Sequence, residues 1–386
     1  MAFTADWQPI VRLALLAGLL ALLPLGWWWW RHRDRPLRAR LALLTALTLF
    51  LTFDLIVFGS FTRLTDSGLG CPDWPGCYGH ASPLGAKADI RAAELALPTG
   101  PVTVAKAWIE MLHRYLAMVV GLLILIAAVV GWRLRRALPH SVWWGVATLV
   151  WVLVQGLFGK YTVTLKLYPA VVTLHLLGAL ILLALLTVQH ESFQDRPLRL
   201  RVRRRAVAAV LGLVMAQAAL GGWVSTNYAV LACSGFPTCN GQWWPEMDWS
   251  AGFSLLRPLG FEADGAGLPF PALVAVHWVH RLFAVLVTAG VLGLAWVLSR
   301  SEDAVARRYA ALLVGLLAWQ VASGVSNVVL GWPILAALCH SAGAAALVGV
   351  LTSLLMRMVL GGRRPASSPV PDAVPAGHAA AAAVSR

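Results

Sequence analysis

The chain has 386 residues, of which 59% are hydrophobic and only 12% are charged, and its mean hydropathy is +0.73. This composition excludes an ordinary soluble domain and predicts an all-α polytopic membrane protein. A formal net charge of +14 would suit a nucleic-acid-binding protein, but the basic residues cluster in short loops between apolar runs. The membrane explains that distribution, so no nucleic-acid partner is expected.

Apolar runs long enough to cross a bilayer occur nine times along the chain. They lie at residues 9–30, 41–62, 105–131, 141–160, 169–188, 206–224, 271–299, 309–330 and 334–356. The first run ends in a cluster of tryptophans and is not followed by a small-residue cleavage site. It is therefore interpreted as a retained helix rather than a cleaved signal peptide.

The loops between these runs alternate in charge. Most of the 31 Lys and Arg residues lie in loops on one side, including RHRDRPLRAR at 31–40 and RPLRLRVRRR at 196–205. The positive-inside rule places these loops in the cytoplasm. The C-terminus is then cytoplasmic and the N-terminus lies outside, which is consistent with an odd number of spans.

The sequence also contains an internal repeat. FGSFTRLTDSGLGCPDWPGC (58–77) aligns with LGGWVSTNYAVLACSGFPTC (220–239), and EMLHRYLA (110–117) aligns with HWVHRLFA (277–284). Each copy contains four of the apolar runs. An even number of helices gives both copies the same orientation, so they are predicted to be parallel four-helix-bundle repeats related by an axis along the membrane normal.

This repeat divides the chain into four predicted segments. Residues 1–40 hold the extra N-terminal transmembrane helix and a basic loop, and residues 41–205 form the first repeat. Residues 206–360 form the second repeat. Residues 361–386 are rich in Pro, Ala and Ser, lack apolar periodicity and are predicted to be a disordered tail.

Four histidines, His113, His175, His280 and His340, fall at matching positions of the two copies. All four are expected in the outer half of the bilayer, where a neutral imidazole is costly unless it is bound or hydrogen-bonded. Facing imidazoles on two helices hold haem iron in membrane bundles, so each copy is predicted to bind iron through its pair. The alternative is a buried histidine bonded to a carbonyl or hydroxyl group. Zinc is disfavoured because no cysteine or carboxylate set completes a tetrahedral shell.

Charged residues accompany two of these histidines. Arg114 and Arg281 follow them directly, and a guanidinium in lipid needs an anionic partner, for which haem propionates are candidates and snorkelling is the alternative. Glu110 lies one turn from His113 on the same face, whereas the second copy has His277 at that position. This difference predicts a reactive role for Glu110, with a salt bridge to an arginine as the alternative.

Two cysteine pairs lie in the outer loops with the same C-x5-C spacing, Cys71 with Cys77 and Cys233 with Cys239. An oxidising exterior permits a disulfide within each pair, and closing so short a loop contributes roughly 2 kcal/mol on the chain-entropy model. A redox-active role for the first pair is the alternative. Gly59, upstream of the first pair, is interpreted as a residue that shapes the outer loop.

These motifs resemble those of the haem A synthase (Cox15/CtaA) family over residues 41–356. The resemblance is carried by GSFTRLTDSGLGCPDWPGCYG (59–79), EMLHR (110–114), His175 in TLHLLGA, VHWVHR (276–281) and LCHSAGA (338–344). It implies oxidation of the C8 methyl of haem O to the formyl group of haem A, for cytochrome oxidase biogenesis. The protein is expected in the bacterial inner membrane, and the charge of the loops places the predicted haem sites toward the periplasm.

The resemblance further implies roles for individual residues and partners. Haem b would be held by His280 and His340, the substrate haem O would lie between His113 and His175, and Glu110 would be catalytic. The expected partners are haem O, membrane lipid and an electron acceptor of unknown identity. Haem O synthase and further copies of the chain are additional candidates.

Two other functions compete with this interpretation. A di-haem b electron-transfer protein would use the same histidine pairs, but it would not explain Glu110 in one copy alone or the elaborate cysteine loop. A transporter built from parallel repeats would use the histidines as proton relays. Haem O synthase activity is disfavoured because the cytoplasmic loops lack acidic clusters for Mg²⁺-diphosphate. Asp54, also in an apolar run, is assigned no role.

Overall fold

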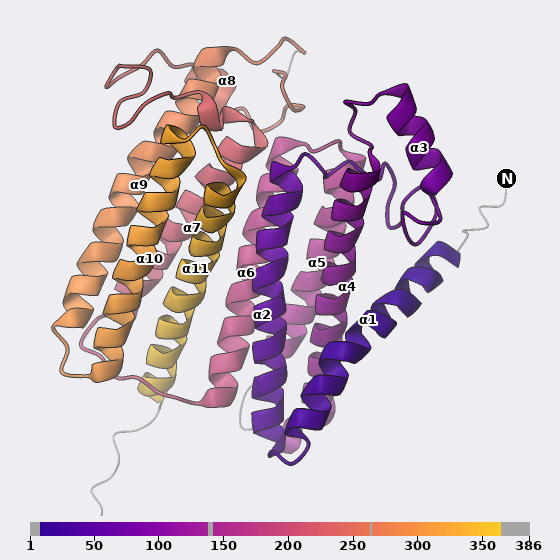
Figure 1. Cartoon of the computed structure of the whole chain (residues 1–386). Helices are drawn as coiled ribbons and strands as arrows, with labels where there is room; N and C mark the ends of the chain where they lie inside the picture. Colours follow the sequence, from indigo (N-terminus) through magenta and orange to yellow (C-terminus); the bar gives the residue numbers. More distant parts are fainter. Residues whose placement is uncertain (1–7, 138–141, 263–264, 364–386) are drawn as a thin grey trace, which may run out of the picture.

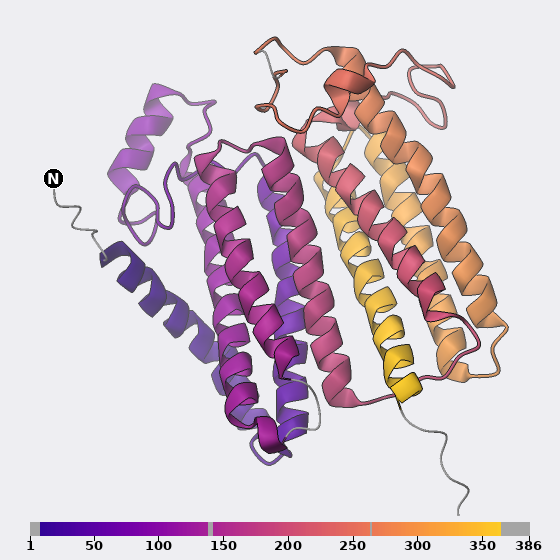
Figure 2. The same ribbon diagram turned by 180° about the vertical axis from the view of Figure 1, so that it is seen from behind.

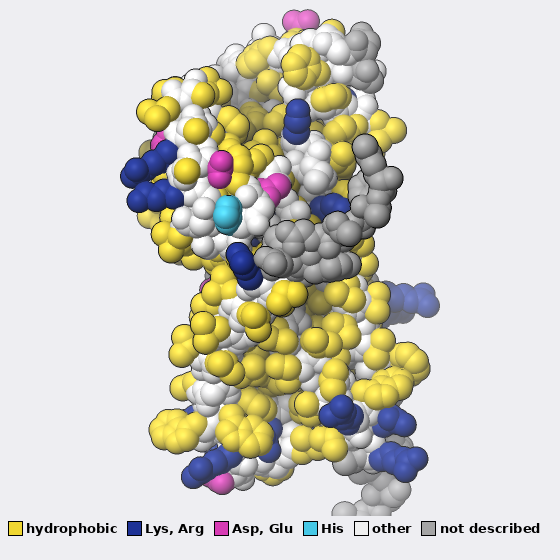
Figure 3. Space-filling model, turned by 90° about the vertical axis from the view of Figure 1, so that its right-hand side faces the viewer, with side chains coloured by type: hydrophobic (Ala, Val, Ile, Leu, Met, Phe, Trp, Pro, Cys, Tyr) yellow, Lys and Arg dark blue, Asp and Glu magenta, His cyan; other side chains and the backbone are white. Residues whose placement is uncertain are grey.

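The structure is a computed structural model that describes residues 8–137, 142–262 and 265–363. Within these ranges, nine helices are long and apolar enough to cross a membrane, which confirms the predicted all-α polytopic class. Hydrophobic side chains cover the middle of the surface seen in Figure 3, and Lys and Arg side chains gather toward its lower end. Residues 364–386 of the predicted tail lie outside the described residues, and the last helix extends beyond the predicted boundary at 360.

The long helices form two groups of four, preceded by one more helix. The first five are α1 (Gln8–His32), α2 (Leu37–Leu64), α4 (Val104–Arg133), α5 (Trp143–Thr164) and α6 (Pro169–Gln194). The last four are α7 (Arg204–Thr226), α9 (Phe270–Ser299), α10 (Ala304–Val329) and α11 (Ile334–Arg363). Short helices are α3 (Lys87–Ala96), α8 (Trp249–Gly252), η1 (Arg135–Ala137) and η2 (Ala229–Leu231).

Local sequence signals set where several of these helices begin. The Thr103 side chain accepts a hydrogen bond from the backbone N–H of Lys106 at the start of α4, and Asp303 accepts one from Val305 at the start of α10. α6 begins at Pro169, whose missing N–H would have no partner in the first turn anyway. Between their ends, the apolar runs remain helical because a bilayer forces backbone groups to hydrogen-bond within their own segment.

Helices α2, α4, α5 and α6 form a closed ring in which each contacts the next, and α7, α9, α10 and α11 form a second ring in the same order (Figures 1 and 2). α4 therefore lies diagonally across from α6, and α9 lies diagonally across from α11. This is the arrangement that a duplicated four-helix unit requires. The boundaries assigned to the repeats remain a prediction.

The two rings meet along α2, α6, α7 and α11. Leu183 of α6 and Leu351 of α11 belong to one buried apolar cluster and are 2% and 0% exposed. Near the outer loops, the Arg63 guanidinium also donates a hydrogen bond to the backbone oxygen of Ser225, 2.5 Å away. Apolar packing through the membrane and polar contacts at its edge thus join the halves.

The end of the molecule that carries the basic loops, lower in Figure 1, is here named the basic face, and the opposite end the outer-loop face. The outer-loop face carries α3 and α8, which the sequence analysis did not predict. α3 packs through Ile90, which is 1% exposed in a cluster with Cys71 and Met111. α1 leans against α4 outside the first ring (Figure 1).

Candidate functional site

His280 on α9 and His340 on α11 face one another across the centre of the second ring. Their ring centroids are 6.5 Å apart and their planes are nearly perpendicular, at 80°. An imidazole nitrogen binds a metal at about 2 Å, so two axial rings around one iron have centroids about 6 Å apart. Each axial ring must be perpendicular to the macrocycle but is free to rotate about its own bond to iron. The predicted pair therefore has the spacing of two axial haem ligands.

A glycine on the neighbouring helix makes room for each ring of this pair. A Cβ added at Gly221 of α7 would lie 3.1 Å from His280, and a Cβ at Gly324 of α10 would lie 3.1 Å from His340. Such a separation is tighter than an ordinary van der Waals contact. Larger residues at these two positions would push the imidazoles out of the centre of the ring.

The first ring repeats this pairing of histidine with glycine. A Cβ at Gly59 of α2 would lie 3.0 Å from Nε2 of His113, and one at Gly159 of α5 would lie 3.7 Å from His175. The interpretation of Gly59 as an outer-loop residue was wrong, because α2 continues to Leu64 and Gly59 lies inside it. Its small size gives space to an imidazole on the adjacent helix.

In the second ring, both histidines have a polar partner on Nδ1. The amide nitrogen of Gln217 lies 3.1 Å from Nδ1 of His280, and Oγ of Ser323 lies 3.1 Å from Nδ1 of His340. A partner on Nδ1 alone, as at His340, fixes the orientation of the ring and leaves Nε2 for a metal. The Gln217 amide nitrogen also donates to the backbone oxygen of His280, 3.1 Å away, and lies 3.4 Å from Nε2 of His280. Neither partner is predicted by the sequence alone.

The first ring lacks these partners. By the repeat alignment, Leu55 stands in the place of Gln217 and Phe158 in the place of Ser323. Nδ1 of His175 is buried without a hydrogen-bond partner.

The His113 ring instead stacks on Phe58, with centroids 6.2 Å apart and planes 18° from parallel. Within the part of the chain that the structure describes, the ring has no hydrogen-bond partner. The two imidazoles of the first ring thus have fewer hydrogen bonds than those of the second.

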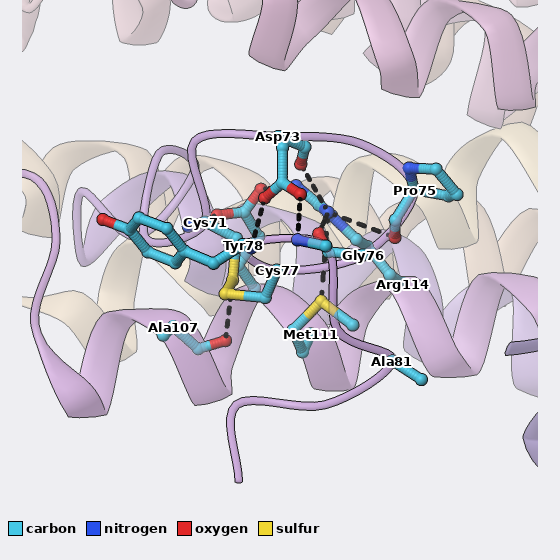
Figure 4. Close-up of a disulfide and its surroundings, with 12 residues drawn as sticks. Cys71, Asp73, Pro75, Gly76, Cys77, Tyr78, Ala81, Ala107, Met111 and Arg114 are labelled. Carbon is cyan, nitrogen blue, oxygen red and sulfur yellow. Dashed lines mark hydrogen bonds and ion pairs between the residues drawn. A yellow bond between two sulfur atoms is a disulfide. The ribbon is translucent and has the colours of Figure 1, made fainter. Parts of the chain in front are cut away.

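Glu110 joins α4 to the first outer loop. Its Oε2 accepts a hydrogen bond of 2.7 Å from the backbone N–H of Cys71, and its Oε1 pairs with Arg114 one turn further along the helix. Arg114 in turn donates to the backbone oxygens of Asp73, at 2.9 Å, and Gly76, at 2.5 Å (Figure 4). The carboxylate is 4% exposed, so it is held rigidly between the loop and the helix.

The second ring has a similar set of contacts around His277, which is a neutral side chain. Nδ1 of His277 lies 3.4 Å from the backbone N of Cys233 and Nε2 lies 3.2 Å from Nε of Arg281; a neutral imidazole has one acceptor nitrogen, so it accepts one of these two hydrogen bonds. Arg281 also donates to the backbone oxygen of Cys233, 2.7 Å away. The donors of Arg281, like those of Arg114, thus have acceptors within the protein. A role for either arginine in propionate binding stays a prediction.

Both predicted disulfides are present, Cys71–Cys77 and Cys233–Cys239. The half-cystines of the first are 0% exposed, and those of the second are 1% and 0% exposed. Their burial means that an external thiol reaches neither bridge unless the loop opens. This favours the structural role over the redox-active alternative.

Comparison with known proteins identifies the family of the chain. The model of the COX15-CtaA family, described as cytochrome oxidase assembly protein, matches residues 42–352. The chain belongs to this family. The resemblance inferred from the loop and histidine motifs is thereby confirmed.

Relatives within the family are named "Heme A synthase". The protein of Shewanella oneidensis is 37% identical over 323 residues, which are 82% of this chain and 96% of the relative. That of Shouchella clausii is 29% identical over 280 residues, 69% of this chain and 85% of the relative. That of Caulobacter vibrioides is 28% identical over 359 residues, 86% and 98% of the two chains. The family match includes both rings and begins after α1, so α1 lies outside the matched region.

Proposed function

We propose that the protein is a haem A synthase, which oxidises the C8 methyl of haem O to the formyl group of haem A. The names of the relatives support this function, and so does the geometry of the second ring. The observation that carries the proposal furthest is the facing pair His280 and His340, with centroids 6.5 Å apart in a ring of four transmembrane helices. By the positive-inside rule, the histidine ends of the helices would lie toward the periplasm.

The second ring is proposed to hold haem b. The donor set fits this group, since two neutral imidazoles converge on one point and adjacent glycines leave space for their rings. When bound there, haem b would supply one-electron transfer. Gln217 and Ser323 contact the Nδ1 atoms and would keep the two rings oriented toward iron.

The first ring is proposed to receive haem O as substrate, between His113 and His175. A substrate must leave after each turnover, and ligands without supporting hydrogen bonds are weaker and less firmly oriented. The unpartnered Nδ1 of His175 and the apolar Phe158 at the position aligned with Ser323 agree with that requirement. The difference between the rings supports exchange in the first and retention in the second.

Glu110 is proposed to accept a proton during oxidation of the methyl carbon. It lies one turn from His113 on α4, and Cys71 and Arg114 fix the orientation of its carboxylate. Oxidation of a methyl to a formyl group proceeds through an alcohol and a hydrated aldehyde; with water as the source of oxygen, each of the two oxidation steps releases two protons and passes two electrons to an external acceptor. A buried carboxylate beside the substrate is placed to take up such a proton.

Purified full-length protein tests this proposal through its haem content. Wild-type protein should yield haem b together with haem O or haem A on extraction. Glu110→Ala should retain haem b but form no haem A, whereas His280→Ala should lose haem b. A wild-type extract containing haem b alone would instead favour a di-haem electron carrier, and full activity of Glu110→Ala would remove the glutamate from the mechanism.

A further inference from the structure

A groove of about 780 Å³ lies between the two rings, away from the four histidines. Helices α2, α6, α10 and α11 line it, near their ends at the basic face (Figure 1). Glu191 at the groove and His175 at the first histidine pair are sixteen residues apart on α6, about 24 Å along the helix. The groove is therefore separate from the proposed haem sites.

The upper walls of the groove are apolar. Phe53 on α2, Leu183 on α6 and Val350 on α11 line this part. From Ala345 to Arg357, both on α11, the lining extends about 18 Å at 1.5 Å per residue. One leaflet of a bilayer has a hydrocarbon depth of about 15 Å, so the groove matches the length of an acyl chain in one leaflet.

The lower end of the groove is polar, and its side chains hydrogen-bond to one another. Arg357 donates to the hydroxyl of Tyr309 at 3.4 Å, and that hydroxyl lies 2.7 Å from Oγ of Ser353. Ser353 in turn donates to Oε1 of Glu191 at 2.5 Å. Residues from both rings thus build one hydrogen-bonded floor.

The charge of this end is positive. Arg196, Arg308 and Arg357 line the groove, and among its described lining residues Glu191 is the sole carboxylate. Basic pockets between transmembrane helices at the cytoplasmic side are suited to anionic lipid headgroups. The apolar part of the groove is about as long as one leaflet, and it ends at the positively charged residues. This combination is complementary to an amphiphile with an anionic headgroup.

We propose that this groove binds an anionic phospholipid, with one acyl chain along α2 and α11 and the phosphate beside Arg308 and Arg357. Because the lining comes from both rings, the bound lipid contacts both halves of the protein and stabilises their association. The site depends on neither the haem ligands nor the proposed reaction, so its test is independent of both.

Full-length protein in detergent tests the headgroup contact. Arg308 is exposed, so Arg308→Gln should not impair folding. Wild-type protein should co-purify with phosphatidylglycerol enriched over the bulk membrane, and adding this lipid should raise its Tm more than adding phosphatidylcholine. Arg308→Gln should lose most of the enrichment and of the Tm increase, and Arg308→Lys should recover part of both.

Two further variants make the test specific. Arg205→Gln removes an exposed charge of α7 outside the groove and should behave like the wild type. Gly349 lines the apolar wall, and a Cβ there meets open space, so Gly349→Leu should displace the acyl chain without changing any charge. Unchanged lipid retention in both Arg308→Gln and Gly349→Leu, or an equal Tm increase with phosphatidylcholine, would overturn the proposal.

Discussion

The two rings place a histidine pair at equivalent positions and surround it differently. In the second ring, Gln217 and Ser323 contact the Nδ1 atoms of both imidazoles. In the first ring, Leu55 and Phe158 stand at the aligned positions, and Nδ1 of His175 has no partner. The two rings thus differ in the residues beside the histidines and not in the histidines themselves, and the proposed retention of haem b and exchange of haem O would depend on that difference.

The two rings also differ in the residue that links the helix to the outer loop, which is Glu110 in the first ring and His277 in the second. Glu110 accepts hydrogen bonds from the Cys71 N–H and from Arg114, whereas His277 lies within hydrogen-bonding distance of the Cys233 N–H and of Arg281 but accepts from one of them. Both side chains link the outer loop to the helix, so a carboxylate is not the only group that can do this. Only Glu110 adds a negative charge, and this points to chemistry in the first ring alone.

Exchanging these two residues should give the largest effect. Glu110→His keeps one acceptor nitrogen for Cys71 or Arg114 but removes the carboxylate and its negative charge, so haem A formation should fall by about 100-fold or more. The reciprocal His277→Glu should leave activity much closer to that of the wild type. Haem A production by whole cells measures both, and the haem b content of the purified protein serves as the folding control. Equal losses in the two variants would contradict a difference in role.

Replacing the glycine beside one histidine by a larger residue should prevent binding at that histidine pair alone. Gly221→Leu should displace His280 and abolish haem b binding, because a Cβ there already lies 3.1 Å from the ring. Gly59→Leu should displace His113 and leave haem b bound while activity is lost. Absorption spectra of the purified variants measure haem b. Retention of haem b by Gly221→Leu would show that His280 is not a ligand.

The Nδ1 partners should affect haem b to an intermediate extent. Removing the hydrogen bond with Ser323→Ala should weaken haem b binding by about 10- to 100-fold and shift its midpoint potential, whereas Ser323→Thr should preserve both. The matched change in the first ring, Phe158→Ser, should slow release of the porphyrin held there. Haem titration and potentiometry provide the measurements. Identical potentials in the wild type and Ser323→Ala would leave Ser323 with no positioning role.

The smallest effect is expected for the disulfides. Replacing either pair by serines should reduce the free energy of unfolding by about 2 kcal/mol, since both bridges close loops of the same length. Thermal unfolding of Cys71→Ser/Cys77→Ser and of Cys233→Ser/Cys239→Ser compares them. A folded first variant that is inactive while the second remains active would support the redox alternative for the first pair.

The fold could be predicted from the sequence because long apolar runs have one stable form in a bilayer. α3 was missed because it lies outside the membrane, is ten residues long and has Ile90 as its one buried residue. The histidines were visible because the repeat marks them twice. Gln217 and Ser323 gave no such signal, since the other copy has apolar residues at both positions, and only the three-dimensional structure shows what they contact.

The position of α1 has a consequence for how a lipid-soluble porphyrin approaches the protein. This helix lies against α4 and screens that flank of the first ring from the surrounding hydrocarbon. On α5, by contrast, Leu153 and Leu157 are 64% and 53% exposed. The first ring therefore faces the surrounding hydrocarbon directly along α5, whereas its α4 flank lies behind a helix outside the family match.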